Sequence, residues 1–173
     1  PPATTQREVW VKTTAKKDLP PGAERYVNRL KPIFAAFGVP EELVWVAEVE
    51  SSFDREAQSP VGATGLFQLM SPTAKSQGLA LEPRDERTHP EKSARAAASY
   101  LKRLHDRFGD WRLALAAYNA GEGRVQRLLD QTRGKTFDDI ATKLPAETQM
   151  YVPKVEAVIR RREGVAFSDL KAP

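Results

Sequence analysis

Glu50 is the residue whose position in this sequence is best suited to acid–base chemistry. A helix is expected from about Pro40 to Ser51, and on it Glu50 shares one face with apolar residues. These apolar residues follow the helical spacing: Leu43, Val46 and Ala47. Glu41 and Glu48 are expected on the opposite side of the helix, where carboxylates stay hydrated.

A carboxyl on the apolar side of a helix loses hydration. This loss disfavours the charged form and raises the pKa of a Glu above its ordinary value of about 4.3. A Glu that keeps its proton near neutral pH is what a general acid requires. Glu50 is therefore a candidate general acid, and the alternatives are a buried Glu that is paired with an arginine or a Glu that reaches solvent because the helix ends there.

The segment after Glu50 combines small residues with a side-chain amide. Gly62 and Gly65, with two small residues between them, let the backbone approach a ligand closely. Gln68 offers both a donor and an acceptor, which suits sugar hydroxyls and acetamido groups. On its own, a Gly-Ala-Thr-Gly run is more typical of a turn than of a binding site.

Several segments between about residues 40 and 160 stand in an order that is known from one family. They are Glu50-Ser51, Ser59-Pro60-Val61-Gly62-Ala63, Gly65-Leu66-Phe67-Gln68, Ala117-Tyr118-Asn119-Ala120-Gly121-Glu122-Gly123 and Glu147-Thr148-Gln149-Met150-Tyr151-Val152-Pro153-Lys154-Val155. Together they resemble the signature of soluble-transglycosylase-type lytic transglycosylases, which are goose-lysozyme-like enzymes (glycoside hydrolase family 23) that cleave bacterial peptidoglycan. The run 109–123 is most similar to the membrane-bound lytic murein transglycosylase D branch. Phe67 departs from the family, where Met is common.

The resemblance implies a role for each matching residue. Glu50 matches the single catalytic acid/base of the family. Substrate-binding roles around the scissile bond are implied for Ser59, Gln68, Met70, Tyr118, Asn119, Glu147 and Tyr151. The residues themselves leave structural alternatives open. Tyr118 and Met70 could be core residues, and Asn119 could end a helix in a turn. Glu147 could act only structurally, because a carboxylate in the first turn of a helix interacts favourably with the helix dipole.

The family's reaction needs one carboxyl group. The resemblance implies that Glu50 protonates the glycosidic oxygen between N-acetylmuramic acid and N-acetylglucosamine, and the substrate's acetamido oxygen then stabilises the anomeric carbon. The Glu50 carboxylate next takes the proton of the C6 hydroxyl, which closes a 1,6-anhydromuramic end. The chain is thus expected to be a carbon–oxygen lyase that acts on a polysaccharide and needs no cofactor. His89 and His105 stand far apart, so no metal site is expected either.

Other functions are weighed against this one. A hydrolytic muramidase of the same fold would need the same Glu and would leave a reducing end. A wall-binding module without catalysis is a further alternative, which the intact Glu50, Gln68, Tyr118 and Asn119 argue against. Nucleic-acid binding is disfavoured because the basic residues are mixed with acidic ones and form no recognisable motif.

Helices are expected to position these residues. The pattern predicts helices over residues 23–37, 40–51, 90–108 and 111–118, a short one from 72, one that ends near 129 and a long one from 145. Thr88 to Glu91 is interpreted as a capping box and Asp110 as an N-cap. The expected fold is mostly α, a single lysozyme-like helical domain with at most a small β element near the cleft. The expected organisation is an extended arm (1–22) that packs through Trp10, the catalytic domain (23–163) and a C-terminal tail (164–173).

The net charge points to an anionic partner. The 173 residues carry a net charge of +4, which suits nucleic acid, an anionic membrane surface or an acidic cell-wall polymer, and composition alone does not choose among them. The expected partner is the glycan strand of peptidoglycan, and the protein is expected to act as a monomer. A protein of the envelope or of a secretion machinery is a further expected partner. No Cys is present, and no apolar run is long enough to span a membrane. We expect a periplasmic or cell-envelope location because the substrate is there; a leader or anchor is not part of this sequence.

Overall fold

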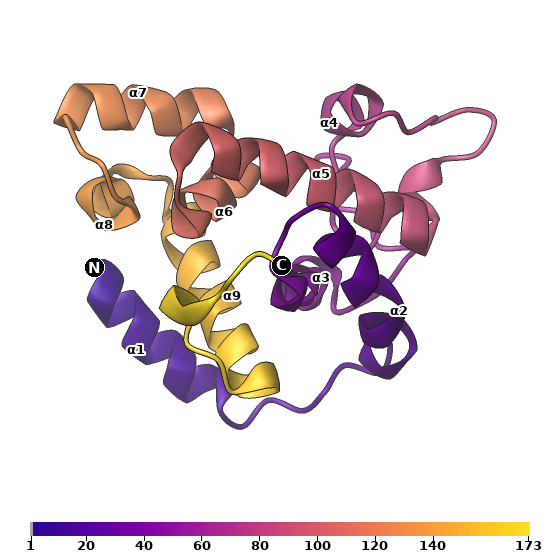
Figure 1. Cartoon of the computed structure of the whole chain (residues 1–173), viewed down its shortest axis with the longest axis horizontal. Helices are drawn as coiled ribbons and strands as arrows, with labels where there is room; N and C mark the ends of the chain where they lie inside the picture. Colours follow the sequence, from indigo (N-terminus) through magenta and orange to yellow (C-terminus); the bar gives the residue numbers. More distant parts are fainter. Residues whose placement is uncertain (1) are drawn as a thin grey trace. The chain divides into compact units, whose positions relative to one another are not determined.

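The fold of this protein, described for residues 2–173 by a computed structural model, is built from helices (Figure 1). The longer helices are α1 (Ala3–Thr14), α2 (Ala23–Ala36), α5 (Pro90–Phe108), α6 (Trp111–Ala120), α7 (Glu122–Thr132) and α9 (Ala146–Glu163). Shorter ones are η1 (Glu41–Trp45), α3 (Val46–Ser51), α4 (Ser71–Ser76), η2 (Glu86–Thr88), α8 (Phe137–Ile140), η3 (Ala141–Lys143) and η4 (Phe167–Asp169). No sheet forms within residues 2–173, where β structure is limited to isolated bridges that Thr64 makes with Gln58 and Leu69. The predicted mostly α fold is confirmed.

The chain divides into two compact units. Unit 1 comprises the residues up to Lys17 together with Arg103–Phe167, and unit 2 comprises Asp18–Lys102 and Ser168–Pro173. In unit 2, α2 buries one apolar face, as its spacing predicts, through side chains that include Leu30 and Phe34. The Phe34 ring lies 5.6 Å from the ring of Phe67, which connects α2 to the segment that follows α3.

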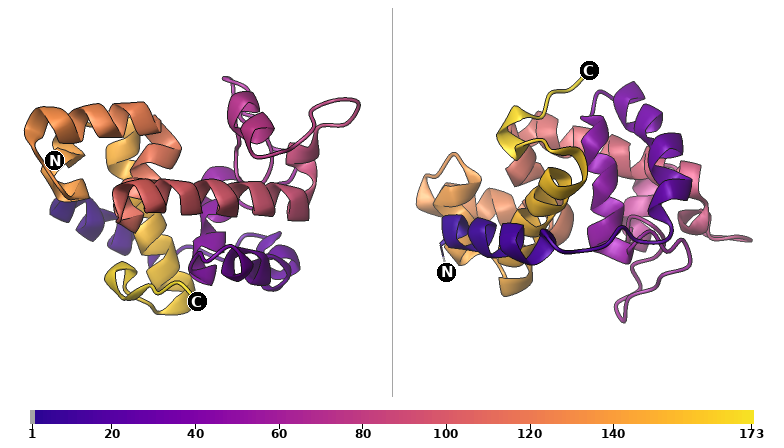
Figure 2. Two further views of the ribbon diagram at one scale, coloured as in Figure 1. Left: turned by 45° about the horizontal axis from the view of Figure 1, so that its top comes forward. Right: turned by 90° about the horizontal axis from the view of Figure 1, so that it is seen from below.

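In unit 1, α1 lies along α9 (Figure 1, Figure 2). The Lys154 ammonium sits 5.2 Å from the centre of the Trp10 ring, and Arg7 forms ion pairs with Glu156 of α9 and Asp138 of α8. The expectation of an extended N-terminal arm is therefore wrong for Ala3–Thr14, although Trp10 does pack as expected. The helix depends on contacts with residues more than 100 positions away, which local patterns do not encode.

Helix ends follow the predicted signals at most positions. The Asp110 carboxylate accepts the Leu113 N–H at 2.9 Å at the start of α6, and Pro145 precedes α9. The predicted capping box at the start of α5 is wrong, because the Thr88 hydroxyl donates to the Asp85 carbonyl instead. The ring Nδ1 of His89 takes the capping role and accepts the Lys92 N–H at 3.2 Å.

Candidate active site

Glu50 is the second-last residue of α3 and is half-buried. The expected single helix over residues 40–51 is a 3₁₀ turn, η1, followed by α3. A 3₁₀ helix has three residues per turn, so the faces of the combined helix differ from those of a regular α-helix. Glu48 is only 2% exposed, and its expected place on a solvated side is wrong, whereas Glu41 is exposed as expected. All residues from Leu43 to Glu48 are buried, so the middle of this helix is covered on every side.

The backbone turns sharply directly after Glu50. Ser52 ends α3 with φ 52°, and Phe53 follows with φ 59°. Two consecutive non-glycine residues in the left-handed region cost roughly 1–3 kcal/mol each, which packing must offset. The Phe53 side chain is 3% exposed, and its ring meets the Trp45 ring edge-on at 5.6 Å. This packing holds the turn, and with it the end of the helix that carries Glu50.

A hydrogen bond ties this helix end to the loop that precedes α4. The Ser51 hydroxyl lies 2.8 Å from the Leu66 carbonyl oxygen and 3.1 Å from the Ala47 carbonyl oxygen. Leu66 is fully buried and lies two residues before Gln68. Two of the predicted site residues, Glu50 and Gln68, are therefore on segments that are directly bonded to each other.

The loop of residues 57–70 is held by its own polar groups. The Gln68 side-chain amide donates to the carbonyl oxygens of Ala57, at 3.0 Å, and Gly65, at 2.9 Å. Both N–H groups of this amide are thus used inside the protein, and only its oxygen remains as an acceptor for a ligand. The expectation that Gln68 offers a donor to a sugar is wrong for this arrangement. Gly65 has φ 87°, and a Cβ there would overlap the Arg87 carbonyl oxygen, so the position needs a glycine.

Arg87, which lies outside the loop of residues 57–70 in sequence, also holds this loop in place. Its guanidinium, in a residue only 7% exposed, donates to the carbonyl oxygens of Gly62 at 3.0 Å and Leu69 at 2.9 Å. It also pairs with the Asp85 carboxylate, 2.7 Å away, and this guanidinium lowers the pKa of the Asp85 carboxyl below its ordinary value. Arg87 was not predicted from the sequence. Its signal would have been the Asp85-Glu86-Arg87 run, which lies shortly before α5.

Ser59 and Met70 lie at the two ends of this loop. The Ser59 hydroxyl oxygen accepts the Ala63 N–H at 3.0 Å and closes a tight turn, which leaves its proton for another acceptor. Met70 stands at the start of α4 and is 42% exposed. The alternative that Met70 fills the core is therefore wrong.

The second group of predicted residues lies in unit 1, at the ends of α6 and α9. Tyr118 and Asn119 are half-buried near the end of α6. The side-chain oxygen Oδ1 of Asn119 accepts a hydrogen bond from the Thr148 hydroxyl at 2.8 Å, and Thr148 is 1% exposed on the first turn of α9. This bond orients the Asn119 amide and leaves its NH₂ group, with two donors, for another acceptor. Thr148 was not singled out from the sequence, although it lies inside a matching segment.

Glu147 and Tyr151 stand one helical turn apart on α9. Glu147 is exposed, whereas Tyr151 is 5% exposed. The structure thus places four predicted residues in each unit: Glu50, Ser59, Gln68 and Met70 in unit 2, and Tyr118, Asn119, Glu147 and Tyr151 in unit 1. Within unit 1, the hydrogen bond from Thr148 joins the end of α6, which carries Asn119, to the first turn of α9, which carries Glu147.

A family model matches the part of the chain that holds most of these residues. The model is described as the transglycosylase SLT domain, and it matches residues 35–141, which is more than half of the sequence. The chain belongs to the transglycosylase SLT domain family. The resemblance stated from the motifs is confirmed. The matched segment includes Glu50 and Asn119, and Glu147 and Tyr151 lie beyond it.

Relatives of this SLT domain chain are named lytic murein transglycosylases. The membrane-bound lytic murein transglycosylase D of Escherichia coli (strain K12) is 39% identical over 140 residues, which cover 79% of the chain and 31% of the relative. The soluble lytic murein transglycosylase of Salmonella typhimurium (strain LT2) is 37% identical over 121 residues, 65% of the chain and 19% of the relative. The chain therefore spans less than a third of the length of these curated relatives.

Solved structures of the same kind share the fold. An inactive Glu-to-Gln mutant of the lytic transglycosylase Slt of Pseudomonas aeruginosa matches with a TM-score of 0.68 and 34% identity, over 82% of this chain and 24% of that one. The 70-kDa soluble lytic transglycosylase of Escherichia coli matches with a TM-score of 0.68 and 28% identity, over 82% of this chain and 25% of that one. The fold is the lysozyme-like fold of lytic transglycosylases.

Proposed function

We propose that this chain is the catalytic part of a peptidoglycan lytic transglycosylase. It cleaves the β-1,4 bond between N-acetylmuramic acid and N-acetylglucosamine and leaves 1,6-anhydromuramic ends. Membership of the SLT domain family and the names of the relatives support the substrate and the reaction class. The observation that carries the proposal is the position of Glu50, which is half-buried at the end of α3 and directly precedes a strained turn. Its neighbour Ser51 donates a hydrogen bond to the Leu66 carbonyl oxygen in the loop of residues 57–70.

Glu50 acts first as an acid and then as a base. Its proton goes to the glycosidic oxygen as the bond from that oxygen to C1 of the muramic residue breaks. The acetamido oxygen of the same sugar bonds to C1 and bears the positive charge with it. The C6 hydroxyl then bonds to C1, its proton passes to the Glu50 carboxylate, and the acetamido group is released. The enzyme ends in its starting state, and no water is consumed.

A second catalytic carboxylate is not supported by the segment after Glu50. Asp54 and Glu56, the nearest acids in that loop, are both exposed. One oxygen of Asp54 accepts the Glu56 N–H at 2.9 Å, which makes it part of its own turn. Exposed carboxylates of this kind stay hydrated. Substrate assistance by the acetamido group fits a chain that offers one positioned acid.

Asn119 is the residue we assign to the acetamido group. Because Thr148 donates to the side-chain oxygen Oδ1 of Asn119, the NH₂ group of this amide remains as a double donor. An acetamido carbonyl oxygen is an acceptor and suits this donor. The fixed orientation would hold the acetamido oxygen for attack on C1 at little entropic cost. Tyr118, its neighbour at the end of α6, is assigned to the same sugar.

The products distinguish this reaction from simple hydrolysis. Purified sacculi would be digested with the chain, and the released muropeptides weighed by mass spectrometry. Anhydromuramic ends, each one water lighter than a reducing end, are the result that the proposal predicts. Muropeptides with reducing ends would show that the chain is a muramidase of the same fold. If no muropeptides were released, the result would favour a wall-binding module.

The place of action follows from the substrate. We place the chain in the periplasm or at the cell envelope, where peptidoglycan lies, and expect it to work as a monomer there. No helix within residues 2–173 is long and apolar enough to cross a membrane. The expected protein partner of the envelope or of a secretion machinery remains a prediction.

A further inference from the structure

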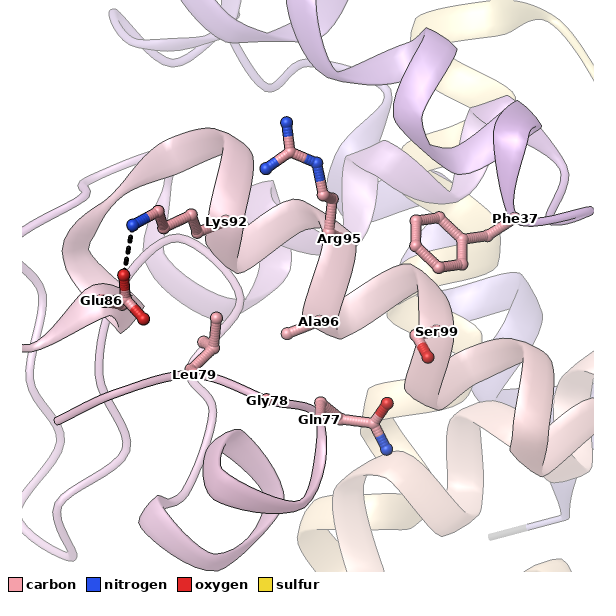
Figure 3. A pocket seen from close by; sticks show the side chains of 9 residues that line it. All are labelled: Phe37, Gln77, Gly78, Leu79, Glu86, Lys92, Arg95, Ala96 and Ser99. Atoms are coloured by element: carbon pink, nitrogen blue, oxygen red, sulfur yellow. Dashed lines mark hydrogen bonds and ion pairs between the residues drawn. The ribbon is translucent and has the colours of Figure 1, made fainter.

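A cavity of about 450 Å³ lies in unit 2, and none of the predicted site residues lines it. Helix α5 forms one side, and the segment 77–79, which follows α4, runs opposite to it (Figure 3). Phe37, directly after α2, and Glu86 of η2 complete the lining. The cavity is thus built from four separate segments of one unit. The reaction proposed above gives this cavity no role.

The wall opposite α5 is fixed by a single carboxylate. One oxygen of Glu86 accepts the Ala80 N–H at 2.7 Å, and the other pairs with the Lys92 ammonium of α5 (Figure 3). The Lys92 ammonium lowers the pKa of the Glu86 carboxyl below its ordinary value, so the pair stays ionised. The Leu79 N–H donates to the Ala74 carbonyl oxygen at 2.9 Å and holds the segment to α4. The charges of Glu86 and Lys92 therefore neutralise each other, and Glu86 also holds the segment 77–80 in place.

Arg95 is the charge that remains for a ligand. It lies one turn after Lys92 on α5, is exposed, and forms no ion pair with any carboxylate of residues 2–173. The lining as a whole carries two cations and one carboxylate, which leaves one positive charge. A guanidinium presents a planar fork of N–H donors that matches a carboxylate. Gln77 and Ser99 add an amide and a hydroxyl to the same cavity.

The rest of the lining suits apolar groups. The Phe37 side chain is 36% exposed, and Leu79 is half-buried on the facing segment. A lining that includes an aromatic ring, an aliphatic side chain and the Arg95 guanidinium suits a ligand that is part apolar and part anionic. A short peptide with methyl side chains and a free carboxylate has this combination.

We propose that this cavity binds the peptide stem of peptidoglycan, with Arg95 holding a stem carboxylate and Phe37 and Leu79 contacting the apolar side chains. The inference rests on the proposed function, because it takes peptidoglycan as the polymer that the chain meets. It adds recognition of the stem to cleavage of the glycan.

The test measures binding of a stem peptide that carries no sugar. A synthetic stem tetrapeptide with free carboxylates would be titrated into the full chain, and affinity measured by calorimetry together with amide chemical shifts of Gly78, Leu79 and Ser99. Loss of one charge-assisted, bidentate hydrogen bond predicts about tenfold or more weaker binding for Arg95→Gln. The matched control is Arg84→Gln, since Arg84 is also exposed and unpaired among the described residues but does not line the cavity. Its affinity should equal that of the unchanged chain.

A stem peptide with all its carboxylates amidated separates charge from shape. It should bind weakly to the unchanged chain and should bind Arg95→Gln equally weakly. Equal affinity of both chains for the free acid, or shifts confined to other residues, would overturn the proposal. The readout involves no cleavage, so it stands even where the lytic activity fails. Conversely, normal anhydromuramic products together with no stem binding would refute only this inference.

Discussion

Arg87 should determine the stability of the loop that carries Ser59 and Gln68. In Arg87→Met, the carbonyl oxygens of Gly62 and Leu69 each lose one of two donors, since Thr64 also donates to both, and the Asp85 carboxylate loses its guanidinium partner. Removing one member of a buried ion pair typically costs about 3–5 kcal/mol.

The lower end of this range applies, because the Asp85 side chain is 27% exposed and water partly replaces the lost pair. We expect the free energy of unfolding to fall by about 3 kcal/mol, which corresponds to a Tm lower by about 6–12 °C in a chain of this size. Urea unfolding followed by circular dichroism measures the change. Arg84→Met, which alters an exposed arginine of the same unit, should stay within about 0.5 kcal/mol of the unchanged chain. A loss below about 1 kcal/mol in Arg87→Met would refute the role given to this residue.

Two further predictions concern the groups around the site. Thr148→Val removes the hydroxyl that orients Asn119, so kcat on glycan strands should fall by about tenfold while KM changes little; an unchanged kcat would contradict the assignment. The pKa of Asp85 in the folded chain is lowered mainly by the hydrogen bond from Arg87. The ionised Asp85 carboxylate therefore contributes fully to the free energy of unfolding above its pKa in the unfolded chain, about 3.9. This contribution is lost as the pH falls through the lower pKa of the folded chain. The difference in unfolding free energy between the unchanged chain and Asp85→Asn should therefore be constant from pH 7 to about 5 and shrink below about 4; a constant difference down to pH 2 would contradict it.

Much of the fold could be predicted because local signals mark the helix ends. Asp110 and Pro145 begin their helices as expected, and Gly38 follows the end of α2. The helix α1 could not be predicted, because it is stabilised by side chains of α8 and α9 that are distant in sequence. The short α8, begun by a capping box of Thr136 and Asp139, was missed because four residues carry no readable periodicity.

The candidate site shows the same division between local and distant information. The motif segments indicated Glu50, Gln68 and Asn119 without any structure. What the sequence could not give is how their polar groups are already used: Gln68 spends both amide N–H groups on its own loop, and Asn119 receives its bond from Thr148. The burial of Glu48 was mispredicted because the change from 3₁₀ to α geometry shifts the faces of the helix.

The most direct test compares Glu50→Gln with Glu56→Gln on purified sacculi. Both changes replace a carboxyl by an amide of the same shape, and they lie six residues apart in one segment. We expect that Glu50→Gln keeps its circular dichroism spectrum and its binding to the wall but releases muropeptides at least about 100-fold more slowly. Glu56→Gln should release anhydromuropeptides at the rate of the unchanged chain, since Glu56 is exposed and has no catalytic part. Undiminished release by Glu50→Gln would contradict the central claim that this glutamate alone moves the proton.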